Sequence, residues 1–84
     1  MNNKHRKTLA AIYREPVSGT ILWADIERLL IAAGADVREG RGSRAMFVKG
    51  GVEAHFHRPH PRKEAKPYQV RDARDFLSKI GVKP

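Results

Sequence analysis

The sequence predicts an α+β fold, in which helices cover one face of a three-stranded antiparallel sheet. Two hydrophobic periods support this class. Apolar residues repeat every three or four positions in segments near both ends of the chain, which is typical of helices. Residues 52–57 instead alternate apolar and polar side chains, which is typical of a strand with one buried face. Gly50 and Gly51 precede that alternation and predict a two-residue hairpin turn.

The helical segments are bounded by residues that commonly start or end helices. Proline cannot continue a helix, and glycine is favoured just after the last turn. Within the second segment Trp23 lies on the apolar stripe, so we expect its ring in the core rather than on the surface. The expected helices are residues 3–15, followed by Pro16, residues 21–33, followed by Gly34, and residues 68–80, between Pro67 and Gly81.

The hairpin turn also fixes the pairing of its two strands. We expect three strands, at residues 35–38, 45–49 and 52–57. Counting outward from the glycine pair places Lys49 opposite Val52 and Arg44 opposite His57. The two phenylalanines of these strands then face the helices. Arg44 and His57 lie on the open face as cross-strand neighbours, with Cβ atoms about 5 Å apart.

Length and composition limit the class of protein. An 84-residue chain is long enough for one small domain, which we expect to span residues 1–84. The absence of cysteine excludes disulfides, a thiolate nucleophile and a cysteine-based zinc site. No apolar run is long enough to span a bilayer and no signal peptide is evident, so we expect a cytoplasmic protein without a membrane partner.

The positive charge is concentrated in the middle of the chain. Residues 38–66 hold eight basic and three acidic side chains, net +5 of the total +8, whereas residues 1–37 are net +1. Such a field favours a nucleic acid, although it also suits a solvated surface that keeps a small protein soluble. The nearly neutral first part argues against a DNA-binding helix-turn-helix there. The expected RNA contacts are Arg41, Ser43, Arg44, Lys49, Arg58, Arg62, Lys63 and Lys66.

Two histidines in the segment His57-Arg58-Pro59-His60-Pro61 could transfer protons. Because its prolines lack backbone donors, we expect this segment to leave the sheet as a stiff arm that carries Arg58 and His60 outside the ladder. Cleavage of RNA at a 2′-hydroxyl needs a base, an acid and a cation on the phosphate, and His57, His60 and Arg44 could fill these roles. Two surface histidines without a catalytic role would have the same spacing.

We expect no metal and no cofactor. His55 and His57 share a face of their strand and His60 follows, but no cysteine or aspartate completes a ligand set, and the surrounding cations repel metal ions. The glycine-rich residues 41–43 lack the Gly-Lys-Ser/Thr of a P-loop, so they are either a basic lip over a phosphate or a plain connector.

Several of these features occur together in one order. They are residues 26–30, Gly34, residues 38–43, Phe47, residues 57–61, Lys63-Glu64 and the last helix to Gly81. In this combination the chain resembles the HicA family of bacterial toxins, small mRNA-cleaving proteins of type II toxin–antitoxin systems. The resemblance implies a double-stranded-RNA-binding-like α-β-β-β-α fold over residues 21–81, with residues 3–15 as an added helix. It also implies mRNA as the substrate and a HicB-type antitoxin as the partner that covers the basic face.

One residue departs from the family's usual Gly-Ser-His motif, whose histidine is catalytic. Arg44 follows Gly42-Ser43 at that position. In one interpretation His57, on the adjacent strand, supplies the imidazole, and the protein is a metal-independent endoribonuclease. In the other, the protein binds RNA or its antitoxin without cleaving.

Overall fold

Two helices, three strands and a last helix follow one another along the chain, and the computed structural model describes all of residues 1–84. The elements are α1 (Asn3–Tyr13), α2 (Trp23–Ala32), β1 (Asp36–Glu39), β2 (Arg44–Lys49), β3 (Val52–His57) and α3 (Pro67–Lys79). The strands form one antiparallel sheet in the order β1-β2-β3. This architecture confirms the predicted fold class, and the α-β-β-β-α order from α2 to α3 is consistent with a double-stranded-RNA-binding-like fold.

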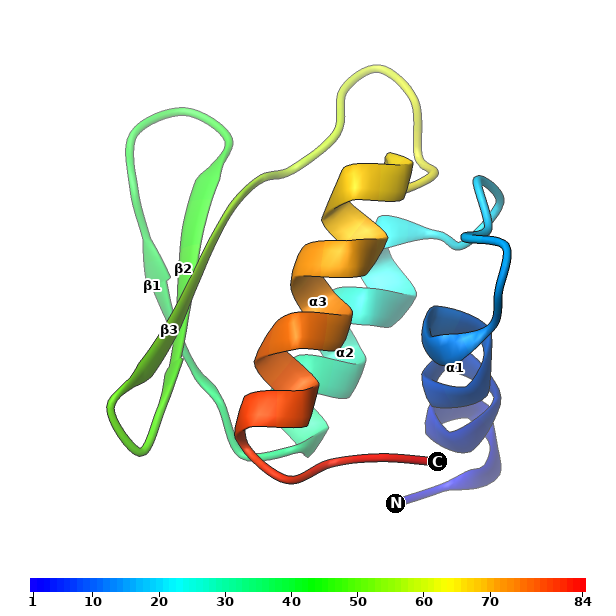
Figure 1. The fold of residues 1–84 in the computed structure, drawn as a ribbon. Coiled ribbons are helices and arrows are strands. Elements are labelled where there is room, and N and C mark those ends of the chain that lie inside the picture. The colour runs from blue at the N-terminus through cyan, green and yellow to red at the C-terminus, as the bar shows by residue number, and fades with distance from the viewer.

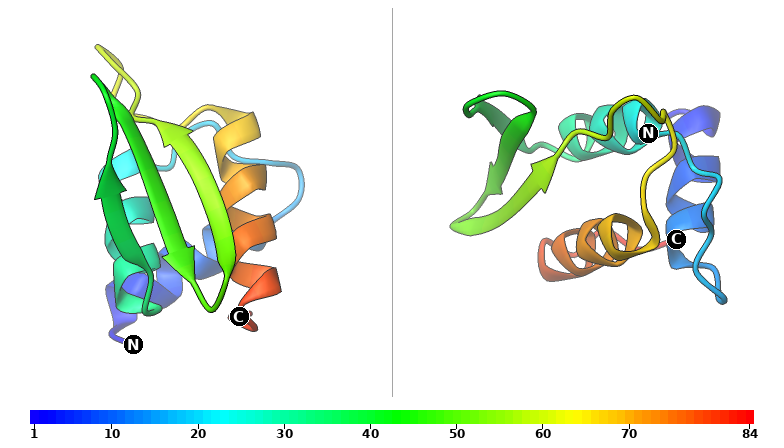
Figure 2. Two further views of the ribbon diagram at one scale, coloured as in Figure 1. Left: turned by 90° about the vertical axis from the view of Figure 1, so that its left-hand side faces the viewer. Right: turned by 90° about the horizontal axis from the view of Figure 1, so that it is seen from above.

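The elements are stacked in three layers. The sheet forms the first, α2 and α3 lie behind it, and α1 packs on the far side of these two helices (Figure 1). The other face of the sheet is uncovered (Figure 2). The β1–β2 loop and the segment after β3 lie at one end of the sheet, and the hairpin turn lies at the other. None of the helices is long and apolar enough to cross a membrane.

The pairing of β2 with β3 confirms the predicted register at all six positions, from Lys49 opposite Val52 to Arg44 opposite His57. Gly50 and Gly51 have φ values of 55° and 80°, and a turn with positive φ at both residues is the hairpin turn that matches the strand twist. The register therefore follows from two residues that tolerate this backbone conformation.

An aromatic cluster joins the sheet to α2. The ring centroid of Trp23 lies 4.9 Å from that of Phe56 and 6.2 Å from that of Phe47. All three side chains are buried. Aromatic pairs at such separations add about 0.5–1.5 kcal/mol beyond the area that they bury. The prediction that Trp23 belongs to the core is confirmed.

The segment before α2 is extended rather than helical, so α2 begins at Trp23 and not at Ile21. Its backbone groups bond instead to the chain after β3. Trp23 N donates to Lys63 O (2.9 Å), and Ile21 O accepts from Ala65 N (2.8 Å). These bonds fasten the segment after β3 against the start of α2.

α1 packs on the rest of the fold through its apolar side, where Ile12 is fully buried in the common core. Arg74 of α3 holds the end of this helix by donating hydrogen bonds to the backbone oxygens of Ile12 (2.9 Å) and Arg14 (3.2 Å). The helix ends at Tyr13, two residues earlier than predicted, because the chain is already extended at Arg14 as it approaches Pro16.

Candidate functional site

Arg44 and His57 lie side by side at one end of the open sheet face. Arg44 is the first residue of β2 and His57 is the last of β3, and the two are paired directly across the strands. Arg38 of β1 is on the same face, because it pairs with Met46, two residues along from Arg44. A groove of about 430 Å³, here called the sheet groove, is lined in part by Arg38, Arg44 and His57.

Residues 58–66, here called the arm, connect β3 to α3 and are tied down at both ends. Arg58 N donates to Ser43 O (2.8 Å), which extends the β2–β3 pairing by one bond beyond His57. At the other end, Lys63 O accepts from Trp23 N at the start of α2, and Ala65 N donates to Ile21 O just before it. His60 lies between these two anchors, and its side chain is exposed. The arm thus leaves the sheet as predicted, and both of its ends are fixed to the fold.

A second groove, here called the arm groove, lies between the arm and the first turn of α3. Its volume of about 640 Å³ falls within the range of about 300–1,000 Å³ that is typical of ligand sites. The polar and aromatic residues that line it include Ser43, His57, His60, Arg62, Lys66 and Tyr68. His57 lines both grooves, so it stands where they meet, with Arg44 in the first and His60 in the second.

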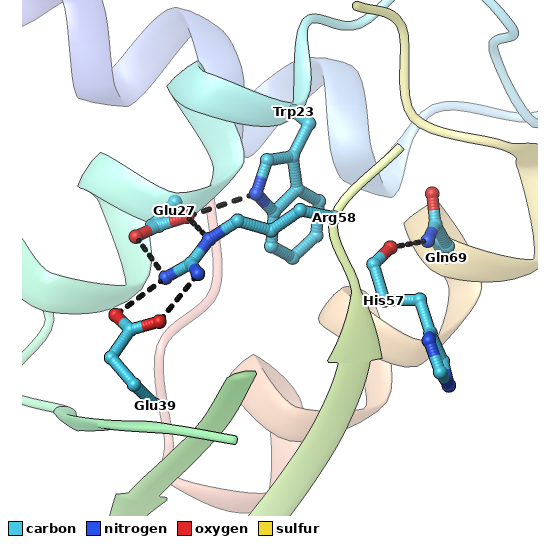
Figure 3. A network of polar contacts seen from close by, with 6 residues as sticks. All are labelled: Trp23, Glu27, Glu39, His57, Arg58 and Gln69. Carbon is cyan, nitrogen blue, oxygen red and sulfur yellow. Dashed lines mark hydrogen bonds and ion pairs between the residues drawn. The ribbon is translucent and has the colours of Figure 1, made fainter. Parts of the chain in front are cut away.

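Gln69 fixes the backbone at His57. Its side-chain amide donates to His57 O (2.7 Å), and its Oε1 accepts from Lys66 N (3.0 Å). Gln69 is 1% exposed, and both bonds replace contacts with water that burial has removed. Figure 3 shows the imidazole of His57 pointing away from this contact. Sequence reasoning missed Gln69, although a glutamine three residues after a helix N-cap is a known capping signal.

Arg58, which the sequence predicts as an RNA contact, lines the arm groove but is also bonded to carboxylates of the fold. Its guanidinium donates four hydrogen bonds of 2.6–3.0 Å, two to Glu27 of α2 and two to Glu39 of β1 (Figure 3). Glu27 also accepts from the indole nitrogen of Trp23 (2.9 Å). We call Glu27, Glu39 and Arg58 the arginine clamp, because they hold α2, β1 and the start of the arm together.

The clamp shifts the acidity of its members. Hydrogen bonds from Arg58 hold the pKa of Glu27 below its ordinary value, against the opposing effect of burial. The same guanidinium lowers the pKa of Glu39, and the two carboxylates together raise the pKa of Arg58. Because its guanidinium is bonded to two carboxylates, Arg58 has a structural role in the fold.

Lys49, another predicted RNA contact, is placed differently from the others. It lies at the hairpin-turn end of β2, and its Nζ donates to Ala33 O (2.7 Å) at the C-terminal end of α2. A cation there satisfies an unpaired carbonyl and complements the negative end of the helix dipole. The register explains the difference, because Lys49 shares the helix-facing side of the sheet with Phe47.

Of the remaining predicted RNA contacts, Ser43, Arg62 and Lys66 line the arm groove, whereas Arg41 and Lys63 line neither groove. Arg41, Ser43, Lys63 and Lys66 are exposed. Arg38, Arg41, Arg44, Lys63 and Lys66 take part in none of the ion pairs of the chain. Arg62 lies 3.9 Å from Glu64 and is 78% exposed, so this pair is weak. These cations keep their charge available for a ligand.

The open sheet face has opposite charge at its two ends. Near the arm it presents Arg38, Arg44 and His57, whereas near the hairpin turn it presents Asp36 and Glu53 on either side of Val48. His55, between the ends, lies 3.3 Å from Glu53. Because of this charge difference, a polyanion would contact the end near the arm.

No group of three or more His, Cys, Asp or Glu side chains is arranged to hold a metal ion.

Comparison with known proteins identifies the family of this chain. A family model described as the HicA toxin of bacterial toxin–antitoxin systems matches residues 23–82, which comprise every element from α2 to α3. No curated protein and no solved structure gives a match. The matched part covers well over half of the chain and leaves outside α1, its connection to α2 and the last two residues. The chain therefore belongs to the HicA family of toxins, the toxin components of bacterial toxin–antitoxin systems.

Proposed function

We propose that this toxin is an endoribonuclease that cleaves mRNA without a metal ion, and that His57, His60 and Arg44 are its catalytic residues. The observation that carries the proposal is the position of His57. It is paired with Arg44 across the sheet and lines the arm groove together with His60. His57 thus shares one groove with a cation suited to phosphate and the other groove with a second histidine.

This set of groups suits transfer of a phosphoryl group to the neighbouring 2′-hydroxyl. One imidazole takes the proton of the 2′-hydroxyl while the oxygen of that hydroxyl attacks phosphorus. The other imidazole gives a proton to the 5′-oxygen as the bond between that oxygen and phosphorus breaks. The products are a 2′,3′-cyclic phosphate and a 5′-hydroxyl. Arg44 stabilises the negative charge that develops on the phosphate oxygens.

The position of Arg44 accounts for the departure from the usual family motif. Arg44 follows Gly42-Ser43, where the family has its histidine. A directly opposite residue on the adjacent strand has its Cβ about 4.5–5.5 Å away, and here that residue is His57. We infer that the imidazole has been exchanged across the strand pair, so that Arg44 binds the phosphate from the former position of the histidine.

The free cations around the grooves supply general affinity for RNA. Arg41 lies on the β1–β2 loop, while Lys63 and Lys66 lie on the arm. All three side chains are exposed and take part in none of the ion pairs of the chain. Neutralising phosphates with such side chains releases counterions, so binding through them weakens steeply as salt rises.

We further propose a HicB-type antitoxin as the partner that neutralises this toxin. A partner with carboxylates on its surface would complement Arg38 and Arg44 and would cover His57. Adding such an antitoxin in equimolar amount should abolish RNA cleavage. Cleavage that continues in the stable complex would contradict blockage at this face.

The proposed activity is tested by incubating the purified toxin with a long mRNA in the presence of EDTA. Wild type should cleave the RNA, and His57→Ala and His60→Ala should each lose about 10²–10⁴-fold in rate. His5→Ala is the control, because His5 lies on α1 and lines neither groove. It should cleave as wild type does. Cleavage that needs added metal, or that survives His57→Ala, would contradict the proposal.

The presence of arginine at the usual histidine position favours one alternative, a module that binds RNA or its antitoxin without cleaving. Arg44 and the free cations would serve such a module equally well. It predicts salt-dependent RNA binding with no cleavage products in the experiment above. Intact RNA with wild type, together with retained binding, would establish this alternative.

A further inference from the structure

We propose that the arm groove binds one unstacked base of a single-stranded RNA against the ring of Tyr68, next to the phosphate held by Arg44. This inference deepens the proposed function and rests on it, because the arm groove is linked to RNA cleavage only through His57, a proposed catalytic residue that lines it. It names a residue that determines the substrate class, single-stranded rather than duplex RNA.

Tyr68 is the exposed aromatic side chain of this protein. Trp23 and the three phenylalanines are buried in the core, and Tyr13 is partly buried with its hydroxyl bonded to Val82 O. Tyr68 is instead 50% exposed, in the first turn of α3, and its hydroxyl takes part in none of the side-chain hydrogen bonds of the chain. The packing of the fold therefore does not account for it.

The surroundings of Tyr68 are those of a nucleotide site. Tyr68 lines the arm groove together with Arg62 and Lys66, two cations suited to phosphates on either side of a base. Stacking on an aromatic ring combined with nearby cations is the usual way in which proteins hold single-stranded RNA. His57 lines this groove and the sheet groove, so a base here belongs to a nucleotide adjacent to the scissile phosphate.

The geometry favours a single strand over a duplex. In a duplex both faces of each base are covered by stacking, and the deep groove of A-form RNA keeps side chains away from base edges. The arm groove is lined by residues of the arm and of the first turn of α3. The open sheet face lies on another side of the molecule from these segments (Figures 1 and 2). A strand that contacts both must bend around His57, which a flexible single strand does readily.

Binding can be measured apart from cleavage with a fully 2′-O-methylated oligonucleotide, which lacks the attacking 2′-hydroxyl. Labelled single-stranded and duplex forms are titrated with the full-length toxin, and affinity is read from fluorescence anisotropy. Tyr68→Ala should weaken single-strand binding about 5- to 150-fold, whereas Tyr68→Phe should keep most of it, because the ring is retained. Ile31→Ala, at the similarly exposed (49%) Ile31 of α2, is the control and should bind as wild type does.

The outcomes separate this inference from the proposed function. Equal single-strand binding by wild type and Tyr68→Ala would overturn the inference even if normal RNA is cleaved. Loss of binding in Tyr68→Phe equal to that in Tyr68→Ala would also overturn it, since the hydroxyl would then be the contact. If Tyr68→Ala weakens only antitoxin binding, the groove belongs to the protein partner and the inference is wrong. Stacking at Tyr68 without cleavage of normal RNA would uphold it and reject only the catalytic proposal.

Discussion

Two neighbouring arginine sites at the same end of the sheet use the same side chain in opposite ways. On the open face, Arg44 stands beside His57 and takes part in none of the ion pairs of the chain. On the helix side, Arg58 follows His57 directly in sequence, yet it is bonded to Glu27 and Glu39. The difference teaches that position relative to carboxylates, and not positive charge alone, decides whether an arginine is bonded within the fold or left free of ion pairs.

The largest expected effect is on the rate of RNA cleavage and concerns Arg44, the arginine on the open face. Arg44→Ala should lower the rate of RNA cleavage about 10²–10³-fold, because it removes the donor nearest to the charge that develops on the phosphate. Thermal unfolding should change little, since Arg44 is exposed. Arg71→Ala, at an exposed arginine of α3, is the control and should keep its rate. A full rate in Arg44→Ala would remove Arg44 from the site.

The helix-side arginine should show the reverse pattern, a loss of stability. Arg58→Ala should lower the free energy of unfolding by about 1–3 kcal/mol, because it removes charged hydrogen bonds and leaves Glu27 partly buried without its partner. Arg58→Lys should also be destabilising, since an ammonium cannot make the paired contacts of a guanidinium. Arg62→Ala should change the free energy of unfolding by less than about 0.5 kcal/mol. Denaturant unfolding measures all three, and equal values for Arg58→Ala and Arg62→Ala would contradict the clamp.

The arginine clamp should also make the free energy of unfolding depend on pH in the acidic range. The pKa of Glu27 is lower in the folded chain than its ordinary value of 4.5, so the unfolded chain binds the proton first as the pH falls. The stabilisation is therefore complete above about pH 4.5 and is lost as the pH falls through the lower pKa of the folded state. Glu27→Gln should flatten this part of the profile of unfolding free energy against pH. An unchanged acid slope in that variant would contradict the assignment.

The smallest expected effect distinguishes Lys63 from Lys49, two lysines that the sequence predicts alike as RNA contacts. Lys63→Ala should reduce the slope of log binding constant against log salt by about 1, the loss expected for one phosphate contact. Lys49→Ala should leave that slope unchanged, because Lys49 caps α2 at the other end of the sheet. Equal slope changes in the two variants would show that RNA extends to the hairpin turn.

Much of this fold could be predicted from local sequence signals. Gly50-Gly51 fixed the register because a two-residue turn permits little else, and that register alone placed Arg44 opposite His57. Strict alternation in β3 identified the buried face, and the boundaries of helices were close wherever proline or glycine ended them. These features depend on neighbours within a few residues, so a single sequence contains them.

The parts that could not be predicted depend on contacts between distant segments. Arg58 lies 31 residues from Glu27 and 19 from Glu39, and nothing in the sequence shows that α2 and β1 bring both carboxylates to it. The later start of α2 has the same origin, because the arm competes for the backbone of Ile21. Lys49 could have been placed correctly, since the predicted register already puts it on the helix-facing side.

The central claim, that His57 and His60 cleave RNA beside Arg44 by attack of the 2′-hydroxyl, is tested most directly by the ends of the RNA fragments. A defined mRNA is incubated with wild-type toxin in EDTA, and the fragment ends are identified by mass spectrometry. The proposal predicts 2′,3′-cyclic phosphate and 5′-hydroxyl ends, with no cleavage at a linkage whose 2′-hydroxyl is methylated. Fragments with 3′-hydroxyl and 5′-phosphate ends, or intact RNA, would contradict it.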